Sequence, residues 1–187
     1  MNKILQWIYK KRAKYYSNKI IPIIKKNETV LDIGAGSGYL AELINQKAKV
    51  TLIDIVDYNQ TKLPLILYDS KKLPFEDNSF DTGLIVAVLH HTSNPENFLQ
   101  ESKRVCKRLI IIEEIYSSIL SRLFLDIWEW FWNKTSGITT FYNFHSNKEW
   151  KEIFSNLNLR LMSNEELKNS LNLPKNLIRM NMFILEK

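Results

Sequence analysis

The chain has 187 residues, a formal net charge of +6 and a single cysteine, Cys106. Its length suits one domain with a substantial core, so we expect a single domain over residues 1–187. One cysteine excludes an internal disulfide framework or a cysteine-based metal cluster, and it fits a reducing compartment. Basic residues at positions 10–14 interrupt the amino-terminal apolar residues before a signal peptide or a membrane span is complete. These features predict a cytoplasmic protein.

Residues 2–25 show a helical pattern with an uneven charge distribution. The first 26 residues contain eight lysines and arginines and no acid, and we interpret residues 1–26 as a basic helical cap. Such a surface could attract RNA, an anionic membrane or an acidic substrate. The simpler interpretation is a solvated helix whose aromatic residues pack on the core.

An apolar strand at residues 30–33 leads into a glycine-dense turn, and a helix follows over residues 37–46. The glycines of the turn, Gly34, Gly36 and Gly38, occupy alternate positions. They let the backbone approach a ligand closely, because they have no Cβ and tolerate positive φ. A strand, such a turn and the amino terminus of a helix together predict a cofactor site.

The glycine spacing indicates which kind of cofactor binds. A dinucleotide fingerprint needs G-x-G-x-x-G, whereas this chain has G-x-G-x-G, which disfavours a dehydrogenase. Asp32 stands two residues before the first glycine. Its negative charge would repel a pyrophosphate but could hold a cationic group.

Two further acids follow at the ends of predicted strands. Asp54 ends a strand over residues 50–54, roughly 20 residues after the first glycine, where it can accept hydrogen bonds from ribose hydroxyls. This acid also suits a nicotinamide cofactor, so it does not discriminate by itself. Asp69 closes a third strand over residues 65–70 and could accept a hydrogen bond from an adenine amino group.

The pattern D-x-G-x-G-x-G, together with the string LPFEDNSFD at residues 73–81, resembles the type 11 class I S-adenosylmethionine (SAM)-dependent methyltransferases. The resemblance covers about residues 30–114. It implies SAM as cofactor and S-adenosylhomocysteine as product. The glycine turn and its acid would hold the methionine end, the next two acids the ribose and the adenine, and the backbone of Ala87 the amino acid group. The cofactor-binding residues implied in this way are Asp32, Gly34, Ala35, Gly36, Gly38, Asp54, Ile55, Asp69, Ser70 and Ala87.

The segment Leu89-His90-His91-Thr92 follows the predicted fourth strand, over residues 82–88. Ligands of open α/β sheets bind at the carboxyl ends of the strands, so these residues should stand near the transferring methyl group. His90 or His91 could act catalytically by taking a proton from the attacking oxygen or nitrogen, or could only shape the pocket. An in-line attack on a sulfonium can also proceed without a base. The three histidines are scattered along the chain, so no metal site is expected.

Alternating strands and helices predict an α/β fold with a Rossmann-like, doubly wound, mostly parallel sheet and helices on both faces. A fifth strand is expected over residues 109–112. Asp81 is expected to begin the fourth strand and to brace neighbouring backbone rather than bind a ligand. The resemblance implies a seven-stranded sheet whose last strands lie near residues 160–162 and 180–185, the final one antiparallel.

Residues 115–146 are interpreted as a helical lid insertion after strand five. The expected helix begins at Tyr116 and carries many aromatic residues. These residues could line an apolar pocket, form a dimer contact or touch a membrane surface, whereas core packing is the simpler interpretation. Ser146 is expected to cap a further helix through a capping box with Glu149.

The function most consistent with these motifs is methyl transfer from SAM to a small, apolar or amphipathic acceptor. An N6-adenine methyltransferase would carry an Asn/Asp-Pro-Pro-aromatic motif after strand four, which this chain lacks. An RNA-modifying methyltransferase of another kind stays an alternative, as does a noncatalytic SAM-binding module that regulates a partner. We therefore expect a small-molecule partner. Nucleic acid is less favoured, peripheral membrane contact stays open, and no transmembrane segment is expected.

Overall fold

The computed structural model describes residues 3–136, 141–168 and 178–187. The chain divides into two compact units. Unit 1 consists of Met1–Leu84 and Arg104–Arg108, and unit 2 of Ile85–Lys103 and Leu109–Lys187. The chain passes between them within β4 (Phe80–Val86), α3 (Pro95–Val105) and β5 (Cys106–Tyr116).

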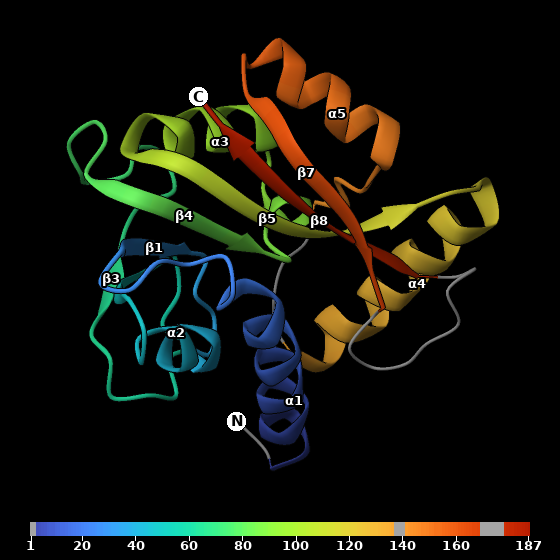
Figure 1. Ribbon diagram of the computed structural model, residues 1–187. Coiled ribbons are helices and arrows are strands. Elements are labelled where there is room, and N and C mark those ends of the chain that lie inside the picture. The colour runs from blue at the N-terminus through green and yellow to red at the C-terminus, as the bar shows by residue number, and fades with distance from the viewer. Residues whose placement is uncertain (1–2, 137–140, 169–177) are drawn as a thin grey trace. The chain divides into compact units, whose positions relative to one another are not determined.

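Unit 1 is built on parallel strands in the order β3, β2, β1, β4 (Figure 1). Its other elements are α1 (Lys3–Ile20), β1 (Thr29–Ile33), α2 (Tyr39–Ile44), β2 (Lys49–Asp54) and β3 (Leu65–Leu67). β1 pairs in parallel with β2 and β4, and β2 pairs in parallel with β3. Because these strands run the same way, their carboxyl ends meet at one edge of the unit, where ligands of such sheets bind.

The run of buried apolar side chains in β1 explains why this strand forms where the sequence predicts it. Val30, Leu31 and Ile33 are fully buried, as parallel strands covered on both faces require. α1 ends at Ile20, before the expected residue 25, because Pro22 cannot donate a helical hydrogen bond and disfavours helix at the residue before it.

The structure confirms the bracing role predicted for Asp81 at the start of β4. Its Oδ2 accepts hydrogen bonds from the Thr29 backbone N–H at 3.1 Å and from the Thr29 hydroxyl at 2.8 Å. Its Oδ1 lies 2.8 Å from the Lys107 ammonium. The Lys107 and Thr29 donors hold the pKa of the Asp81 carboxyl well below its usual range. Asp81 thus links the first residues of β1, β4 and β5 within unit 1.

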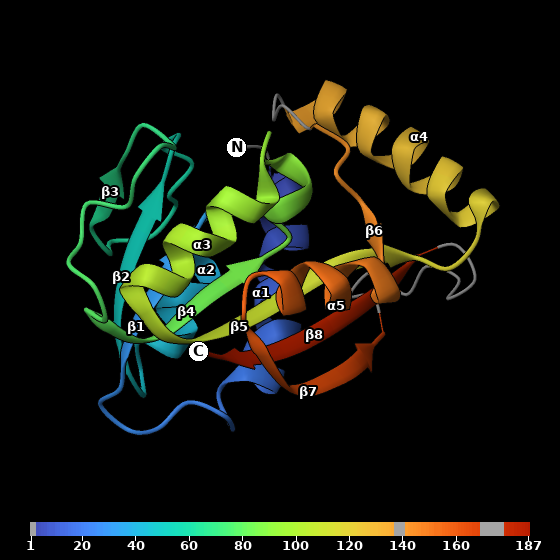
Figure 2. The same cartoon turned by 90° about the horizontal axis from the view of Figure 1, so that it is seen from above.

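Unit 2 combines three long strands with helices of very different composition. It contains the 3-10 turn Leu89–His91, α4 (Ile119–Ser136), β6 (His145–Ser146), α5 (Asn147–Asn156), β7 (Arg160–Leu167) and β8 (Arg179–Glu186). β8 lies between β5 and β7 and runs antiparallel to β7 (Figure 2). β6 pairs in parallel with the end of β5, so the described residues contain eight strands where the sequence predicts seven.

β5 is longer than predicted at both ends. It begins at Cys106, directly after α3, and continues through Tyr116, where the sequence predicts the start of a helix. The helix α4 instead begins at Ile119, because the Ser118 hydroxyl accepts a hydrogen bond from the Ser121 backbone N–H and caps it. None of the helices in the described residues combines the length and apolar content that a membrane crossing needs.

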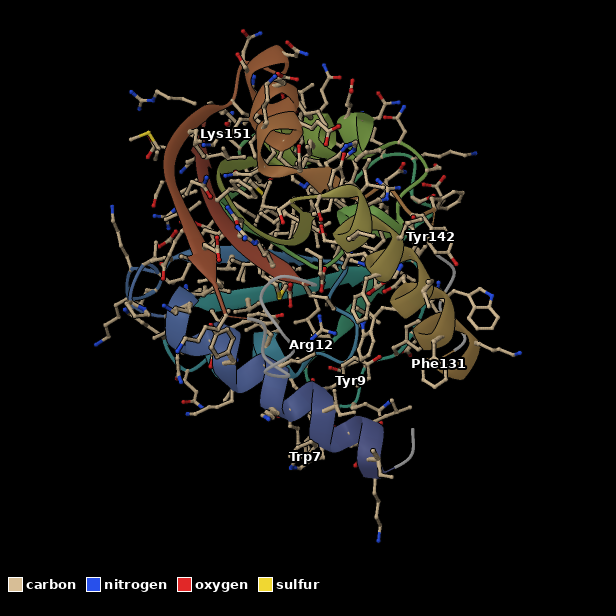
Figure 3. All side chains as sticks on the ribbon, turned by 90° about the vertical axis from the view of Figure 1, so that its right-hand side faces the viewer. Trp7, Tyr9, Arg12, Phe131, Tyr142 and Lys151 are labelled. Carbon is tan, nitrogen blue, oxygen red and sulfur yellow. The ribbon has the colours of Figure 1, made fainter. Side chains whose placement is uncertain are left out.

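One face of α4 is packed and another is exposed. Leu125 belongs to a buried cluster with Phe144 and Ile178, and the partly buried Phe124 and Trp128 of α4 pack against it. Trp130 and Phe131 are more than half exposed, and Figure 3 shows the Phe131 side chain on the outside of the helix. The expectation of aromatic core packing is therefore confirmed for part of this helix only.

The capping box predicted at α5 is present. The Ser146 hydroxyl accepts from the Glu149 backbone N–H, and the Glu149 carboxylate accepts from the Ser146 backbone N–H at 2.7 Å. Glu149 also accepts a hydrogen bond from the Tyr116 hydroxyl at 2.5 Å. These donors lower the pKa of Glu149 to about 2, with the Tyr116 hydroxyl as the largest cause.

We expect Ser146→Ala to lower the free energy of unfolding by about 1 kcal/mol, because it removes one half of the capping box. Ser155→Ala, at an exposed position of the same helix, is the matched control and should change stability by less than about 0.5 kcal/mol. Equilibrium denaturation of both variants checks this. Equal effects of the two substitutions would contradict a capping role for Ser146.

Candidate functional site

The glycine turn of unit 1 has the backbone conformation that its sequence requires. Gly34, Gly36 and Gly38 have φ values of 77°, 53° and 73°, all in the left-handed region that side chains disfavour. The turn is fastened to the end of β2, because the backbone N–H groups of Gly34 and Ala35 both donate to the Ile53 carbonyl, at 2.9 and 3.2 Å.

Asp54 completes this attachment with its side chain. One carboxylate oxygen accepts from the Gly36 backbone N–H at 2.8 Å, and the other accepts from the Ile55 N–H at 2.7 Å. Asp54 therefore positions the turn, a role that the sequence did not predict. The oxygen that accepts from Ile55 also accepts from the Val56 N–H at 3.4 Å, so the acceptor capacity that remains for the ribose is on the oxygen bonded to Gly36.

The space around the glycines differs from one to the next. A Cβ added at Gly36 would meet no atom within 4 Å. A Cβ added at Gly38 would lie 2.5 Å from the Asn59 Oδ1 and 3.1 Å from the Thr61 hydroxyl. A loop after β2 thus packs on the turn at Gly38, with the Gln60 backbone N–H donating to the Ser37 carbonyl at 3.0 Å. The open surface of the turn is at Gly36.

Asp32 is the most electrostatically perturbed acid of unit 1. It lies on β1 with 3% of its surface exposed. Burial, reinforced by the negative charge of Asp54, raises its pKa to about 7. A buried carboxylate of this kind is stabilised by a cationic ligand.

The other cofactor-binding residues predicted for unit 1 lie just after the ends of β2 and β3. β3 stops at Leu67, so Asp69 and Ser70 lie beyond it, both exposed, rather than within a strand that reaches residue 70. Ser70 has φ 63°, which ends the extended chain, and Asp69 accepts from the Lys71 backbone N–H at 3.0 Å. Ile55 is exposed beside Asp54.

These residues fit SAM. The open space at Gly36 admits a ligand against the backbone, and the buried Asp32 carboxylate offers a counter-charge for its ammonium and sulfonium. Asp54 and Asp69 supply acceptors at the ends of neighbouring strands, since Asp54 lies opposite Leu67 of β3. An acid at the Asp32 position would oppose a pyrophosphate group.

Unit 2 contains the other predicted site residues. Ala87 has φ 55°, an uncommon conformation for a residue with a Cβ, and its N–H donates to the Ile112 carbonyl at 2.8 Å. The turn Leu89–His91 follows it. The Glu113 carboxylate organises this turn, because one of its oxygens accepts from the Val88 and Leu89 backbone N–H groups, both at 2.7 Å.

The second oxygen of Glu113 lies 2.8 Å from Nδ1 of His90. The His90 ring is buried and stacks on Phe144, with 4.9 Å between ring centroids. Burial disfavours the imidazolium form, but the carboxylates of Glu113, Glu114 and Glu129 outweigh it and raise the pKa of His90 to about 9. A histidine that is cationic near neutral pH does not accept a proton, which argues against His90 as a general base.

The two other histidines occupy different surroundings. His91 lies beside His90, with ring centroids 4.1 Å apart, and its Nε2 is 3.7 Å from a carboxylate oxygen of Glu129 on α4. His145 is on β6 with its ring edge-on to Trp150. Burial lowers the pKa of His145. Sequence analysis did not assign the three glutamates around His90 and His91 to the site. The position of Glu113 and Glu114 directly after a buried apolar run is the signal that could have identified two of them.

Asp32→Asn should stabilise the cofactor-free protein at alkaline pH. The folded-state pKa of Asp32 lies above the unfolded value, so the wild type loses stability as the pH rises from about 4 to about 7. We expect the variant to match the wild type at pH 4 and to exceed it at pH 8 by up to about 4 kcal/mol, the equivalent of about three pKa units.

Urea denaturation at several pH values measures this difference. Asp57→Asn, at an exposed position, is the matched control and should show no such trend. A constant difference between Asp32→Asn and the wild type across the pH range would contradict a buried, perturbed carboxyl at Asp32.

Comparisons with known proteins agree with the motifs. A family model described as a methyltransferase domain matches residues 31–110. A demethylmenaquinone methyltransferase of Thermotoga maritima is 32% identical over 99 residues, which are 46% of this chain and 43% of that protein. A tRNA (carboxymethyluridine(34)-5-O)-methyltransferase of Schizosaccharomyces pombe is 25% identical over 122 residues, which are 58% of this chain and 54% of that protein. The chain thus spans about half the length of these curated relatives.

The fold has counterparts among solved structures. A chain solved in complex with the Haloferax volcanii Trm112 methyltransferase activator aligns with a TM-score of 0.71 and 16% identity, over 95% of this chain and 93% of that one. At this identity the likeness concerns the fold alone, and it confirms the Rossmann-like α/β class. Motifs, family model and relatives agree that residues 31–110 match a methyltransferase domain of the type 11, class I SAM-dependent kind, whose cofactor is SAM.

Proposed function

We propose that the protein transfers a methyl group from SAM to a small, apolar or amphipathic acceptor. The observation that carries this proposal is the pairing, within unit 1, of an open glycine turn with a buried acid whose pKa is about 7. When bound, SAM supplies a methyl group on a cationic sulfur, which is reactive towards a nucleophile.

Each residue of unit 1 has a separate task in this proposal. Asp32 attracts the cationic methionine end, and the Gly36 region lets that end approach the backbone. Asp54 orients the ribose through the acceptor capacity that its bonds to Gly36 and Ile55 leave over. Asp69 and Ser70 contact the adenine. The main contribution to rate is then orientation and alignment of the two reactants.

For unit 2 we propose that Ala87 offers backbone to the amino acid group and that His90 and His91 position the acceptor. The raised pKa of His90 supports a positioning role over proton abstraction. A small acceptor is supported by the relatives named for quinone methylation and by the apolar side chains that α4 exposes.

An RNA acceptor is the second candidate. α1 carries basic residues and no acid in its first turn, and Figure 3 shows Trp7 projecting from it, where it is 60% exposed. Exposed aromatic and basic side chains suit stacking and phosphate contacts. Two curated relatives are named for modification of a tRNA uridine.

Gly36→Ala should abolish SAM binding while leaving the fold intact. The added methyl group meets no protein atom, so its cost in the protein is the left-handed φ, about 1 kcal/mol. In the complex the same methyl group occupies the space that the methionine end needs. Calorimetric titration with SAM, and with NAD as the ligand control, measures the effect.

Asn158→Ala is the matched variant, because Asn158 has φ 52° at an exposed position of unit 2 and the substitution imposes a similar backbone cost. It should bind SAM as the wild type does. Absence of SAM binding by the wild type, or equal binding by both variants, would refute the proposed cofactor site.

The acceptor class is decided by a methyl-transfer assay with radiolabelled SAM. We expect transfer to demethylated quinols or related apolar phenols, and no change in that rate for Lys10→Glu/Lys11→Glu, since both positions are exposed on α1. Transfer to tRNA that the double variant reduces, and more so at raised salt, would establish the RNA alternative instead.

A further inference from the structure

We propose that His90, His91 and Glu129 form a binding site for one first-row divalent transition metal ion such as Zn²⁺. The ligand atoms that these three residues offer lie within 4.8 Å of one another. The site lies within unit 2 and does not depend on the proposed methyl transfer. Two imidazoles and one carboxylate form the donor set that such ions prefer.

The distances are close to those of a bound ion. Zinc binds imidazole nitrogen and carboxylate oxygen at about 2.0–2.2 Å, so two of its ligand atoms are at most about 4.4 Å apart. His91 Nε2 and the Glu129 carboxylate already satisfy this limit at 3.7 Å. The ligand atom of His90 lies no more than 4.8 Å from the other two, so a small side-chain adjustment would bring all three to one centre.

Glu113 prepares His90 for this role. Its carboxylate accepts from two backbone N–H groups and lies 2.8 Å from His90 Nδ1, so Nδ1 keeps its proton and a metal ion would bind Nε2 in place of the second proton of the ring. A carboxylate that holds the outer N–H of a ligating histidine fixes the ring and raises its basicity. Stacking on Phe144 holds the same ring from one face.

The local charge also favours a cation. Glu113 is 1% exposed and Glu129 7% exposed, and Glu114 Oε2 lies 3.6 Å from His90 Nδ1. Buried carboxylates around two imidazoles are stabilised by a positive ion more than surface acids are, because little solvent screens them. The three protein ligands leave one or more coordination positions for water or for an acceptor oxygen.

The alternative set of His90, Glu113 and Glu114 is also compact. We favour Glu129 as the ligand, because Glu113 lies on the Nδ1 side of the His90 ring, whereas a Glu129 oxygen lies 3.7 Å from Nε2 of His91, the second imidazole of the set. Substitution of Glu129 and substitution of Glu114 distinguish the two sets of ligands.

The test is metal binding by the full chain after dialysis against a chelator. Calorimetric titration with Zn²⁺ should show one ion per chain for the wild type. His91→Asn and Glu129→Gln should each weaken binding at least about tenfold, since each removes a ligand. Mg²⁺, which prefers oxygen ligands, should bind much more weakly.

Matched controls come from the same unit. His145→Asn removes the remaining histidine, and Glu152→Gln alters an exposed glutamate of α5, so both should bind Zn²⁺ as the wild type does. Circular dichroism checks that each variant is folded. If one ligand variant does not fold, the other decides the result.

Three results would overturn the site. These are no stoichiometric Zn²⁺ binding by the wild type, undiminished binding by the folded His91→Asn or Glu129→Gln variants, and a loss of binding with Glu114→Gln but not with Glu129→Gln. SAM titration of the same samples keeps the two proposals apart, because retained SAM binding with no Zn²⁺ binding refutes the metal site alone.

Discussion

The attachment of the glycine turn to the end of β2 is the constraint on which the cofactor site depends. Three consecutive backbone N–H groups, those of Gly34, Ala35 and Gly36, bond to the last two residues of β2. These bonds need left-handed backbone at alternate positions, which only glycine adopts without strain. The turn is therefore rigid although it carries no regular structure, and it places the Gly36 surface and Asp54 in a fixed relation.

Both units bury charge in a way that a cation would relieve. In unit 1, Asp32 is held beside Asp54 at a pKa of about 7. In unit 2, three glutamates surround the His90 ring and raise its pKa to about 9. The buried Asp32 carboxylate costs stability in the absence of a cation, and functional sites commonly carry such a cost, whereas the protonated His90 ring already offsets part of the negative charge around it. The cofactor proposed for unit 1 and the metal ion proposed for unit 2 would each offset this negative charge.

Local sequence signals predicted much of the fold. The strand, turn and helix around the glycines and the capping box of Ser146 depend on residues close in sequence, and the place of Asp81 at the start of a predicted strand indicated its bracing role, although its partner Thr29 lies 52 residues away. Element ends were less predictable. β3 stops three residues early, and β5 extends through Tyr116, because strand ends depend on pairing with distant segments.

The side chains that contact the glycine turn and the histidines could not be predicted for the same reason. Asn59 packs on Gly38 from the loop after β2. Glu113 on β5 lies 23 residues after His90, and Glu129 on α4 lies 38 residues after His91. Only folding brings these side chains together, and no spacing rule in a single sequence encodes such contacts.

The most direct test of the cofactor site is an NMR titration of the isotope-labelled protein with S-adenosylhomocysteine, following the backbone amides. The largest shifts should fall on residues 34–38, 54–55 and 69–70, with the Gly36 amide among them. Saturable binding with its largest shifts outside these segments, or no binding at millimolar ligand, would contradict a cofactor site on the glycine turn.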